Sequence, residues 1–142
     1  MLRKSLVLIP LVAIASWVAG AAAPAPQPPA GGKVDFVKQI KPLLEANCAK
    51  CHGERPTKAY SLLTKEQAFT PGESEERPIV PGKPESSLIV QLMKSPDKEH
   101  RMPQKAAAMK AADIALIEKW ISEGATWPDD VKLTPPPEEK KK

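Results

Sequence analysis

Residues 48–52 read CAKCH, so Cys48 and Cys51 are separated by two residues and His52 follows directly. Two thiols at this spacing project to the same side of a helical turn, where they can add across the two vinyl groups of one haem. The adjacent imidazole can then reach the iron. The 142-residue chain has only these two cysteines, and only two histidines. The pattern therefore predicts one covalently attached haem c, held by Cys48 and Cys51, with His52 as an iron ligand.

Three other uses of the same residues compete with haem. A thioredoxin-like dithiol would follow a strand of a βαβ unit, and no strand is predicted before Cys48. A zinc site could add His100 to the motif, but adjacent Cys51 and His52 rarely point at one tetrahedral centre. A buried disulfide would leave His52 without a role. We therefore expect haem.

The composition fits a domain whose interior is completed by a cofactor. Aromatic residues make up 4% of the chain and 17 residues are Pro, which leaves little large apolar material for a core. The formal net charge is only +4, and Arg3 and Lys4 of the expected leader contribute two of these charges, so nothing favours nucleic-acid binding. We expect the haem to pack among apolar side chains of the first and last helices: Phe36, Leu43, Leu44, Ile114, Ile117 and Trp120.

The two ends of the chain differ in composition from its middle. Residues 1–21 have a basic start, an apolar run and a small-residue end, which predicts a signal peptide; the uncharged run 6–23 also reaches the lower limit for a retained membrane anchor. Residues 22–33 form a Pro/Ala-rich linker, and residues 129–142 a disordered Pro/Lys-rich tail. The folded domain is expected over residues 34–128, in the periplasm or elsewhere outside the cytoplasm, with a membrane tether only if the leader is retained.

Apolar periodicity predicts a helix at each end of this domain. Asp35 can cap a first helix, which we expect to kink near Pro42 because proline removes a backbone donor. A closing helix is predicted over residues 111–123, where isoleucines recur at helical spacing, and Gly124 is placed to end it.

The middle of the domain has weaker signals. Thr64 can cap a short helical turn, a Pro81-Gly82 pair suits a type II turn, and Pro84 can begin a helix that extends through Met93. No stretch alternates at period two, as a half-buried strand would. The expected fold class is all-α: a small helical domain with long loops, wrapped around one haem.

A methionine is the expected sixth ligand, because a thioether stabilises Fe(II). Met102 lies in a loop where Pro103 restrains its backbone, so we select Met102 as the distal iron ligand. Met93 fits core packing on its predicted helix, and Met109 fits a staple at a helix entrance. His100 is the remaining rival and would give bis-imidazole iron.

These motifs together resemble a small class I-like c-type cytochrome, and more narrowly the Planctomycete-type cytochrome c family. The family pattern F-x-x-x-I-x-P-L-L is matched by Phe36, Ile40, Pro42, Leu43 and Leu44. The pattern V-P-G-x-P-x-x-S is matched by Val80, Pro81, Gly82, Pro84 and Ser87. The pattern W-I-x-x-G-A is matched by Trp120, Ile121, Gly124 and Ala125. The polar residues 54–59 depart from the family.

The resemblance implies thioether anchors at Cys48 and Cys51, a proximal ligand at His52 and a distal ligand at Met102. It also implies first and last helices that cross beside the haem. The function expected is that of a monohaem carrier of single electrons between redox partner proteins, not an enzyme. The alternative is a peroxidase-like, ligand-binding or sensor domain with a displaceable sixth ligand. A modest basic rim near Met102 could orient an acidic partner or be a solvated face: Lys94, Lys98, Arg101 and Lys105.

Overall fold

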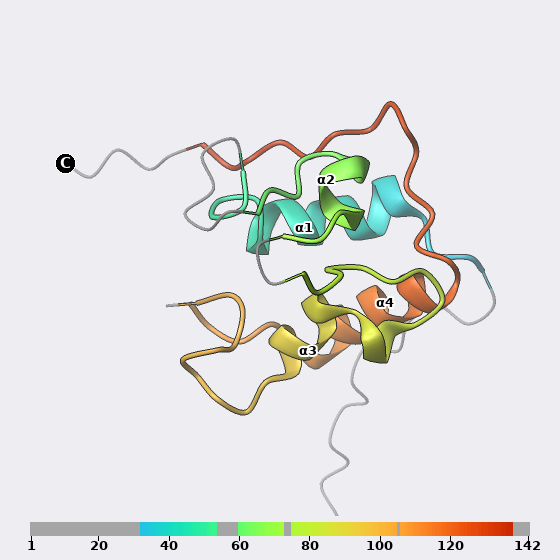
Figure 1. Cartoon of the computed structure of the whole chain (residues 1–142). Helices are drawn as coiled ribbons and strands as arrows, with labels where there is room; N and C mark the ends of the chain where they lie inside the picture. The colour runs from blue at the N-terminus through green and yellow to red at the C-terminus, as the bar shows by residue number, and fades with distance from the viewer. Residues whose placement is uncertain (1–31, 54–59, 73–74, 105, 138–142) are drawn as a thin grey trace, which may run out of the picture.

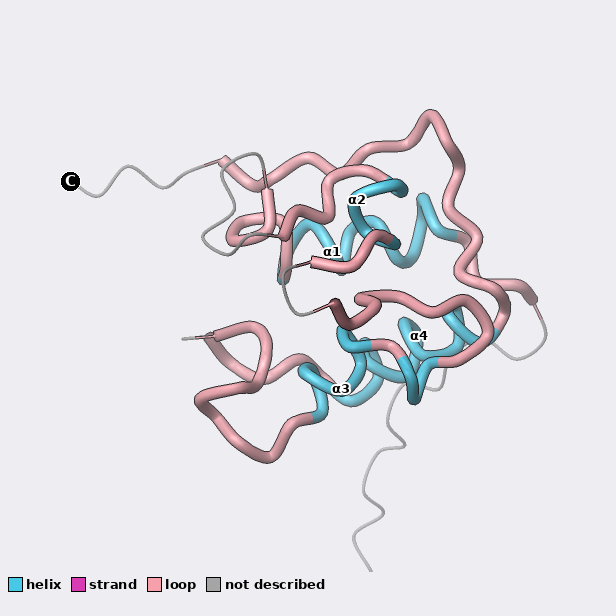
Figure 2. Tube along the Cα trace, viewed as in Figure 1, coloured by secondary structure: helices cyan, strands magenta, loops and turns pink. Residues whose placement is uncertain are grey.

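The computed structural model describes residues 32–53, 60–72, 75–104 and 106–137 (Figure 1). Within these ranges the chain forms short helices and no strand, joined by long loops (Figure 2). The all-α prediction is therefore confirmed. The predicted signal peptide and almost all of the linker lie outside the described residues. No helix of the described ranges combines the length and the apolar character that crossing a membrane requires.

The first helix begins where Asp35 predicts it. The Asp35 carboxylate accepts a backbone N–H of the first turn at 3.0 Å, and η1 (Phe36–Ile40) passes directly into α1 (Lys41–Asn47). The η1 turn is a π-helix, in which the Lys41 N–H bonds to the carbonyl five residues back. A wider turn moves backbone away from the ring of Pro42, which would clash with the carbonyl four residues before it. The predicted kink is thus a widened turn, and the helix continues through it.

The closing helix α4 (Ala111–Ser122) also forms as predicted. Its buried side chains are Ile117, Trp120 and Ile121, and α4 packs against η1, α3 and η2. Gly124 follows with φ of +100°, a conformation that costs glycine little and other residues more. Contact between η1 and α4 confirms that the first and last helices meet.

A short helix α2 (Lys65–Phe69) follows the CAKCH region. Thr64 caps it as predicted: the Thr64 hydroxyl accepts the Gln67 N–H at 3.3 Å, and the Gln67 side chain accepts the Thr64 N–H at 3.2 Å. This reciprocal capping box stabilises a helix that is too short to form by itself.

The single helix predicted over residues 84–93 is wrong. The structure has a 3₁₀ turn, η2 (Pro84–Ser86), and a separate helix α3 (Leu88–Lys94), with Ser87 extended between them. Ser87 is fully buried, and its hydroxyl accepts the Val80 N–H at 2.9 Å and donates to the Lys83 carbonyl at 2.9 Å. These bonds tie Ser87 to the preceding turn, whose Gly82 has the positive φ of a type II turn, and so interrupt the helix.

An aromatic cluster forms the centre of the core. The Phe36 ring centroid lies 4.2 Å from that of Trp127 and 5.5 Å from that of Trp120. The two indole N–H groups are satisfied within the fold: Trp120 donates to the Thr126 carbonyl at 2.9 Å, and Trp127 to the Val131 carbonyl at 2.7 Å. Three aromatic residues from both ends of the domain therefore hold the first and last helices together.

The C-terminal segment, residues 128–137, differs from the expected solvated tail. Leu133 is buried, its N–H donates to the Leu63 carbonyl at 2.8 Å, and the Thr134 N–H donates to Glu45 at 2.6 Å. Figure 1 shows the segment running back over the side of the molecule that carries α1 and α2. The fold thus extends past residue 128, because Leu133 provides an apolar side chain that the prolines around it do not. Residues 138–142 of the predicted tail lie outside the described part.

Candidate functional site

A cavity of about 410 Å³ lies beside the CAKCH motif, within the size range of ligand-binding pockets. Cys48, Cys51, His52 and Met102 all border this pocket, so the structure brings together the four residues selected from the sequence. Most of its remaining wall is apolar. The other lining residues are Asn47, Tyr60, Leu62, Gly72, Glu76, Pro78, Leu88, Ile89, Leu92, Met93, Pro103, Gln104 and Met109.

The CAKCH motif forms a tight turn at the end of α1. The N–H groups of Cys51 and His52 both bond to the Cys48 carbonyl, at 3.1 and 3.0 Å. Gly53 closes the turn, and a Cβ built there would lie 2.6 Å from the Ala49 carbonyl oxygen. The turn therefore needs glycine at this position, and it presents both thiols and the imidazole to one pocket.

His52 is held through one ring nitrogen. Its Nδ1 lies 3.1 Å from the carbonyl oxygen of Tyr60, and because a carbonyl only accepts, Nδ1 must carry the hydrogen. In the neutral imidazole, the other nitrogen, Nε2, then has the lone pair. A carbonyl partner of this kind is what orients metal-binding histidines and increases their basicity. His52 is therefore prepared to act as a metal ligand through Nε2.

Tyr60 is itself fixed. Its hydroxyl donates to the Ala68 carbonyl in α2 at 3.1 Å, and its ring meets the His52 ring edge-on at 5.6 Å between centroids. Burial, and secondarily the charge of Cys48, raises the pKa of the Tyr60 phenol, so the hydroxyl stays a donor. Tyr60 was not predicted from the sequence, because its hydrogen bond to His52 uses a backbone carbonyl that every residue type carries.

The Cys48 thiol does not have the electrostatics of a redox-active thiol. Burial, with a smaller effect of Cys51, raises the pKa of the Cys48 thiol to about 12. A catalytic dithiol needs a nucleophilic cysteine whose pKa is lowered, so this environment disfavours the thioredoxin-like alternative. The described residues also contain no group of three or more His, Cys, Asp or Glu side chains that could hold a metal ion. The zinc site with His100 is therefore not assembled.

Met102 is placed at the pocket by its backbone. The Met102 N–H donates to the Leu92 carbonyl at the end of α3, at 3.0 Å, and the side chain is half-buried. Met93 and Met109 also border the pocket and are more buried, at 3% and 8% exposed. Three thioethers therefore face one cavity, which the sequence could not show because the three methionines belong to different segments.

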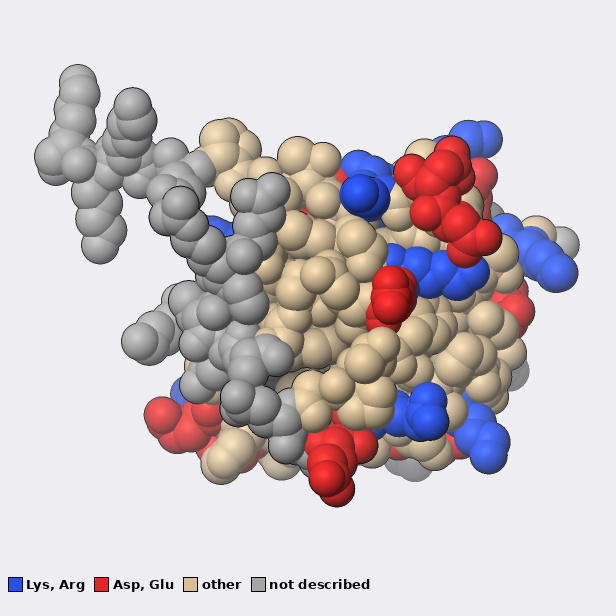
Figure 3. Space-filling model, turned by 45° about the horizontal axis from the view of Figure 1, so that its top comes forward, with Lys and Arg blue, Asp and Glu red and all other residues tan. Residues whose placement is uncertain are grey.

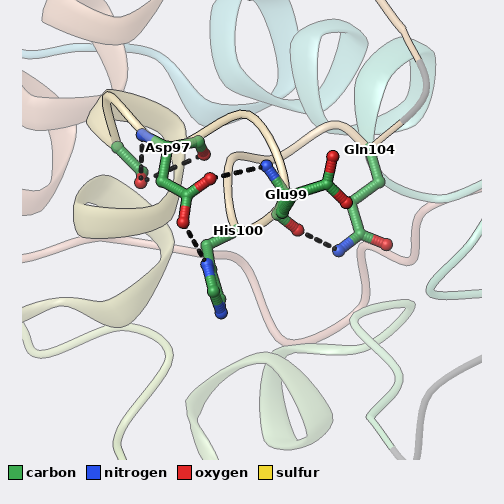
Figure 4. Close-up of polar contacts among 5 residues, drawn as sticks. Asp97, Glu99, His100 and Gln104 are labelled. Atoms are coloured by element: carbon green, nitrogen blue, oxygen red, sulfur yellow. Dashed lines mark hydrogen bonds and ion pairs between the residues drawn. The ribbon is translucent and has the colours of Figure 1, made fainter.

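His100 does not border the pocket. Its ring is exposed and its Nδ1 lies 2.6 Å from a carboxylate oxygen of Asp97, as Figure 4 shows. The hydrogen bond from His100, then that from the Glu99 N–H, lowers the pKa of Asp97. Gln104 Nε2 donates to the Glu99 carbonyl at 3.0 Å across the same loop. These contacts organise the loop before Met102 from its solvent side.

The predicted walls of the haem site are wrong. None of the six residues expected to surround the haem borders the pocket; they belong to the helices around the aromatic cluster. The walls come from α3 and from the segments around Tyr60 and Pro78. The spacing of Leu88 and Leu92 was the available signal for α3, but the extended segments have no periodicity to read.

Two of the four residues of the basic rim expected near Met102 are not seen as free positive charges in the described structure. Lys94 pairs with Glu118 of α4, with 2.8 Å between Nζ and the carboxylate oxygen, and Lys105 lies outside the described residues. On the face of the molecule in Figure 3, basic and acidic side chains alternate and form no single-sign patch. That face therefore offers no strong field of one sign.

Comparison with known proteins gives one finding about the family. A model of the family described as Planctomycete cytochrome C matches residues 48–105. No curated protein and no solved structure matches the chain significantly. The matched residues begin at Cys48 and include the CAKCH turn, α2, α3 and Met102. The resemblance inferred from the sequence is confirmed over residues 48–105, which match the model of the Planctomycete cytochrome C family.

Proposed function

We propose that the protein is a monohaem c-type cytochrome that carries single electrons between redox proteins outside the cytoplasm. The observation that supports this most is the state of His52: its Nδ1 bonds to the Tyr60 carbonyl while the residue borders a pocket shared with Cys48 and Cys51. A neutral imidazole beside two thiols is the donor set that a covalent haem requires.

The pocket fits the group. Cys48 and Cys51 would form the two thioether bonds, and His52 and Met102 would bind the iron. When bound, the haem supplies an iron that alternates between Fe(III) and Fe(II). The CAKCH turn would orient the haem, and apolar walls such as Leu62 would exclude water from it and so help to set its reduction potential.

The residues favour electron transfer over substrate chemistry. Met102 is tied to Leu92 through its backbone, and Met93 and Met109 border the same cavity. If the Met102 thioether binds the iron, it would stabilise Fe(II) and would leave no open site for a substrate. We therefore propose a carrier and not an enzyme, with other redox proteins as partners.

The place of action follows from the leader. Residues 1–21 are proposed as an export signal, with residues 22–33 as a linker, and a membrane tether exists only if the leader is retained. The compartment outside the cytoplasm is oxidising, so free thiols persist there only if they are bonded to something. The chain has only the two cysteines of the motif, which would be bonded to haem.

The proposal is tested by the mass of the protein. The chain is exported from cells that have c-type haem attachment machinery, and its intact mass is measured under denaturing conditions. We expect the mature polypeptide plus one haem, and haem staining on a denaturing gel.

Cys48→Ala with Cys51→Ala removes both thioether bonds, so this variant should have the mass of the bare polypeptide. Lys50→Ala, a change inside the motif that keeps both thiols and the imidazole, is the control and should retain the haem. A wild-type mass equal to the bare polypeptide contradicts the proposal.

A further inference from the structure

Leu133 connects the C-terminal segment to the loop that holds His52. The Leu133 side chain is 4% exposed, and its N–H donates to the Leu63 carbonyl at 2.8 Å. Leu63 lies three residues after Tyr60, whose carbonyl accepts the hydrogen bond of His52 Nδ1. In the same loop the Leu62 N–H donates to the His52 carbonyl at 2.9 Å. Leu133 therefore fixes the segment that contains both partners of His52.

Thr134 connects the same segment to α1. Its N–H donates to the Glu45 carboxylate at 2.6 Å, and the same carboxylate oxygen pairs with Lys41 one turn earlier. The Lys41 and Glu45 side chains are 24% and 22% exposed, so this bond is partly shielded from water and stronger than a surface contact. Glu45 lies three residues before Cys48. Thr134 thus holds the part of α1 that leads into the CAKCH turn.

Pro135 lies directly behind the turn. A Cβ built on Gly53 would be 3.2 Å from Pro135 Cγ, tighter than ordinary van der Waals contact. Gly53 is buried and follows His52 in sequence. The ring of Pro135 therefore packs against the residue that directly follows the CAKCH motif.

We propose that residues 133–135 position His52, by tying α1, the CAKCH turn and the Tyr60 loop together. The three contacts are made to Glu45, three residues before the motif, to Gly53, directly after it, and to the loop that carries the acceptor of Nδ1. Without them, the turn and the loop are connected by fewer bonds, and the distance from Nδ1 to the Tyr60 carbonyl is less fixed. That the positioned residue is an iron ligand rests on the proposed function. That residues 133–135 hold the His52 ring in place does not.

The test compares two truncations of the exported protein. The chain ending at Lys132 lacks residues 133–135 but keeps the Val131 carbonyl that Trp127 uses. The chain ending at Pro137 keeps them and is the control. NMR of the reduced protein measures hydrogen exchange at the Leu62 N–H and at His52 Nδ1–H. We expect exchange at both to be about tenfold faster or more in the shorter chain, and unchanged in the control. Amides of α4 report general loosening and should change less than these two sites.

A second set of variants leaves the chain length intact. Glu45→Ala removes the acceptor of the Thr134 N–H and should also speed exchange at Leu62 and His52. Glu45→Gln retains an acceptor oxygen and should restore slow exchange, and Lys41→Ala, which keeps the Glu45–Thr134 bond, should not change it. If Glu45→Ala exchanges at the wild-type rate, or α4 amides change as much as those near His52, positioning by these residues is wrong. Intact masses are measured on the same samples, and a wild-type chain without haem would refute the proposed function alone, since the exchange comparison remains valid.

Discussion

Three methionine side chains border one pocket, and their attachment to the fold differs. Met93 lies on α3 and Met109 just before α4, and both are buried in the hydrophobic core. Met102 is half-buried in a loop whose backbone is bonded to the end of α3. A ligand needs a sulfur that is oriented but not required for packing. Met102 meets this condition best, because removing its thioether leaves the core contacts of the other two unchanged.

This difference predicts separate outcomes for two substitutions in the haem-loaded protein. Met102→Ala should abolish the methionine-to-iron charge-transfer band of the oxidised form and lower the reduction potential, because the thioether no longer stabilises Fe(II). Met109→Ala should keep the band but reduce stability by about 2–5 kcal/mol, as expected for a buried methionine. Absorption spectra and denaturant unfolding measure the two effects. Loss of the band in Met109→Ala, with its retention in Met102→Ala, would assign the ligand to Met109.

The short helix α2 helps to hold the residues of the pocket in place. It is only five residues long, yet its Ala68 carbonyl accepts the Tyr60 hydroxyl, and Tyr60 in turn provides the carbonyl that holds His52. The capping box of Thr64 therefore supports, through Ala68 and Tyr60, the side of the pocket that carries His52. A short helix depends on its cap more than a long one, because little else offsets the cost of nucleation.

Thr64→Ala should accordingly lower the free energy of unfolding by about 1 kcal/mol, the usual cost of losing an N-cap hydroxyl. Exchange at the Gln67 N–H should accelerate, since this donor loses the Thr64 acceptor. Thr126→Ala is the matched control, because Thr126 contributes to the fold through its backbone carbonyl, which accepts from Trp120. Urea unfolding measures both variants, and equal stability losses would show that the cap is unimportant.

The sequence predicted those elements whose ends are set by local chemistry. Asp35, Thr64 and Gly124 act on backbone groups within a few residues, so their effects could be read from neighbouring positions. The break at Ser87 could not, because it depends on a buried hydroxyl that bonds to the turn at Val80. The packing of Leu133 was missed for the same reason: its partner, Leu63, lies far away in the sequence.

The candidate site was likewise predicted only in part. The chemistry of Cys48, Cys51 and His52 is contained in five consecutive residues, and the structure places all three at one pocket together with Met102. The walls of that pocket were predicted incorrectly, because apolar periodicity shows which face of a helix is buried but not what covers it. Phe36 and Trp120 are buried as the pattern predicts, but they pack against Trp127.

At the level of the whole molecule, the interior has two parts. One is the aromatic cluster of Phe36, Trp120 and Trp127, which joins η1, α4 and the start of the C-terminal segment. The other is the pocket, bordered by the CAKCH turn and α3. Because the aromatic cluster does not border the pocket, we expect its packing to persist without the cofactor.

The haem-free variant Cys48→Ala with Cys51→Ala should therefore keep the aromatic cluster. We expect blue-shifted tryptophan fluorescence and a near-UV circular dichroism signal, because Trp120 and Trp127 stay buried. Amides of α3 should exchange faster than those of α4, since α3 loses the group that its Leu88 and Leu92 would contact. Tryptophan emission as red-shifted as in urea would show instead that the whole core depends on haem.

The packing of residues 133–135 behind the CAKCH turn has a consequence for biogenesis. These residues follow His52 by roughly 80 positions, and ribosomes add about 5–20 residues per second. For about 4–16 s after His52 is synthesised, a growing chain therefore lacks the residue that packs behind the CAKCH turn. An attachment enzyme that acts before residues 133–135 have packed would meet an open turn, whereas one that acts on the folded protein would first have to displace these residues.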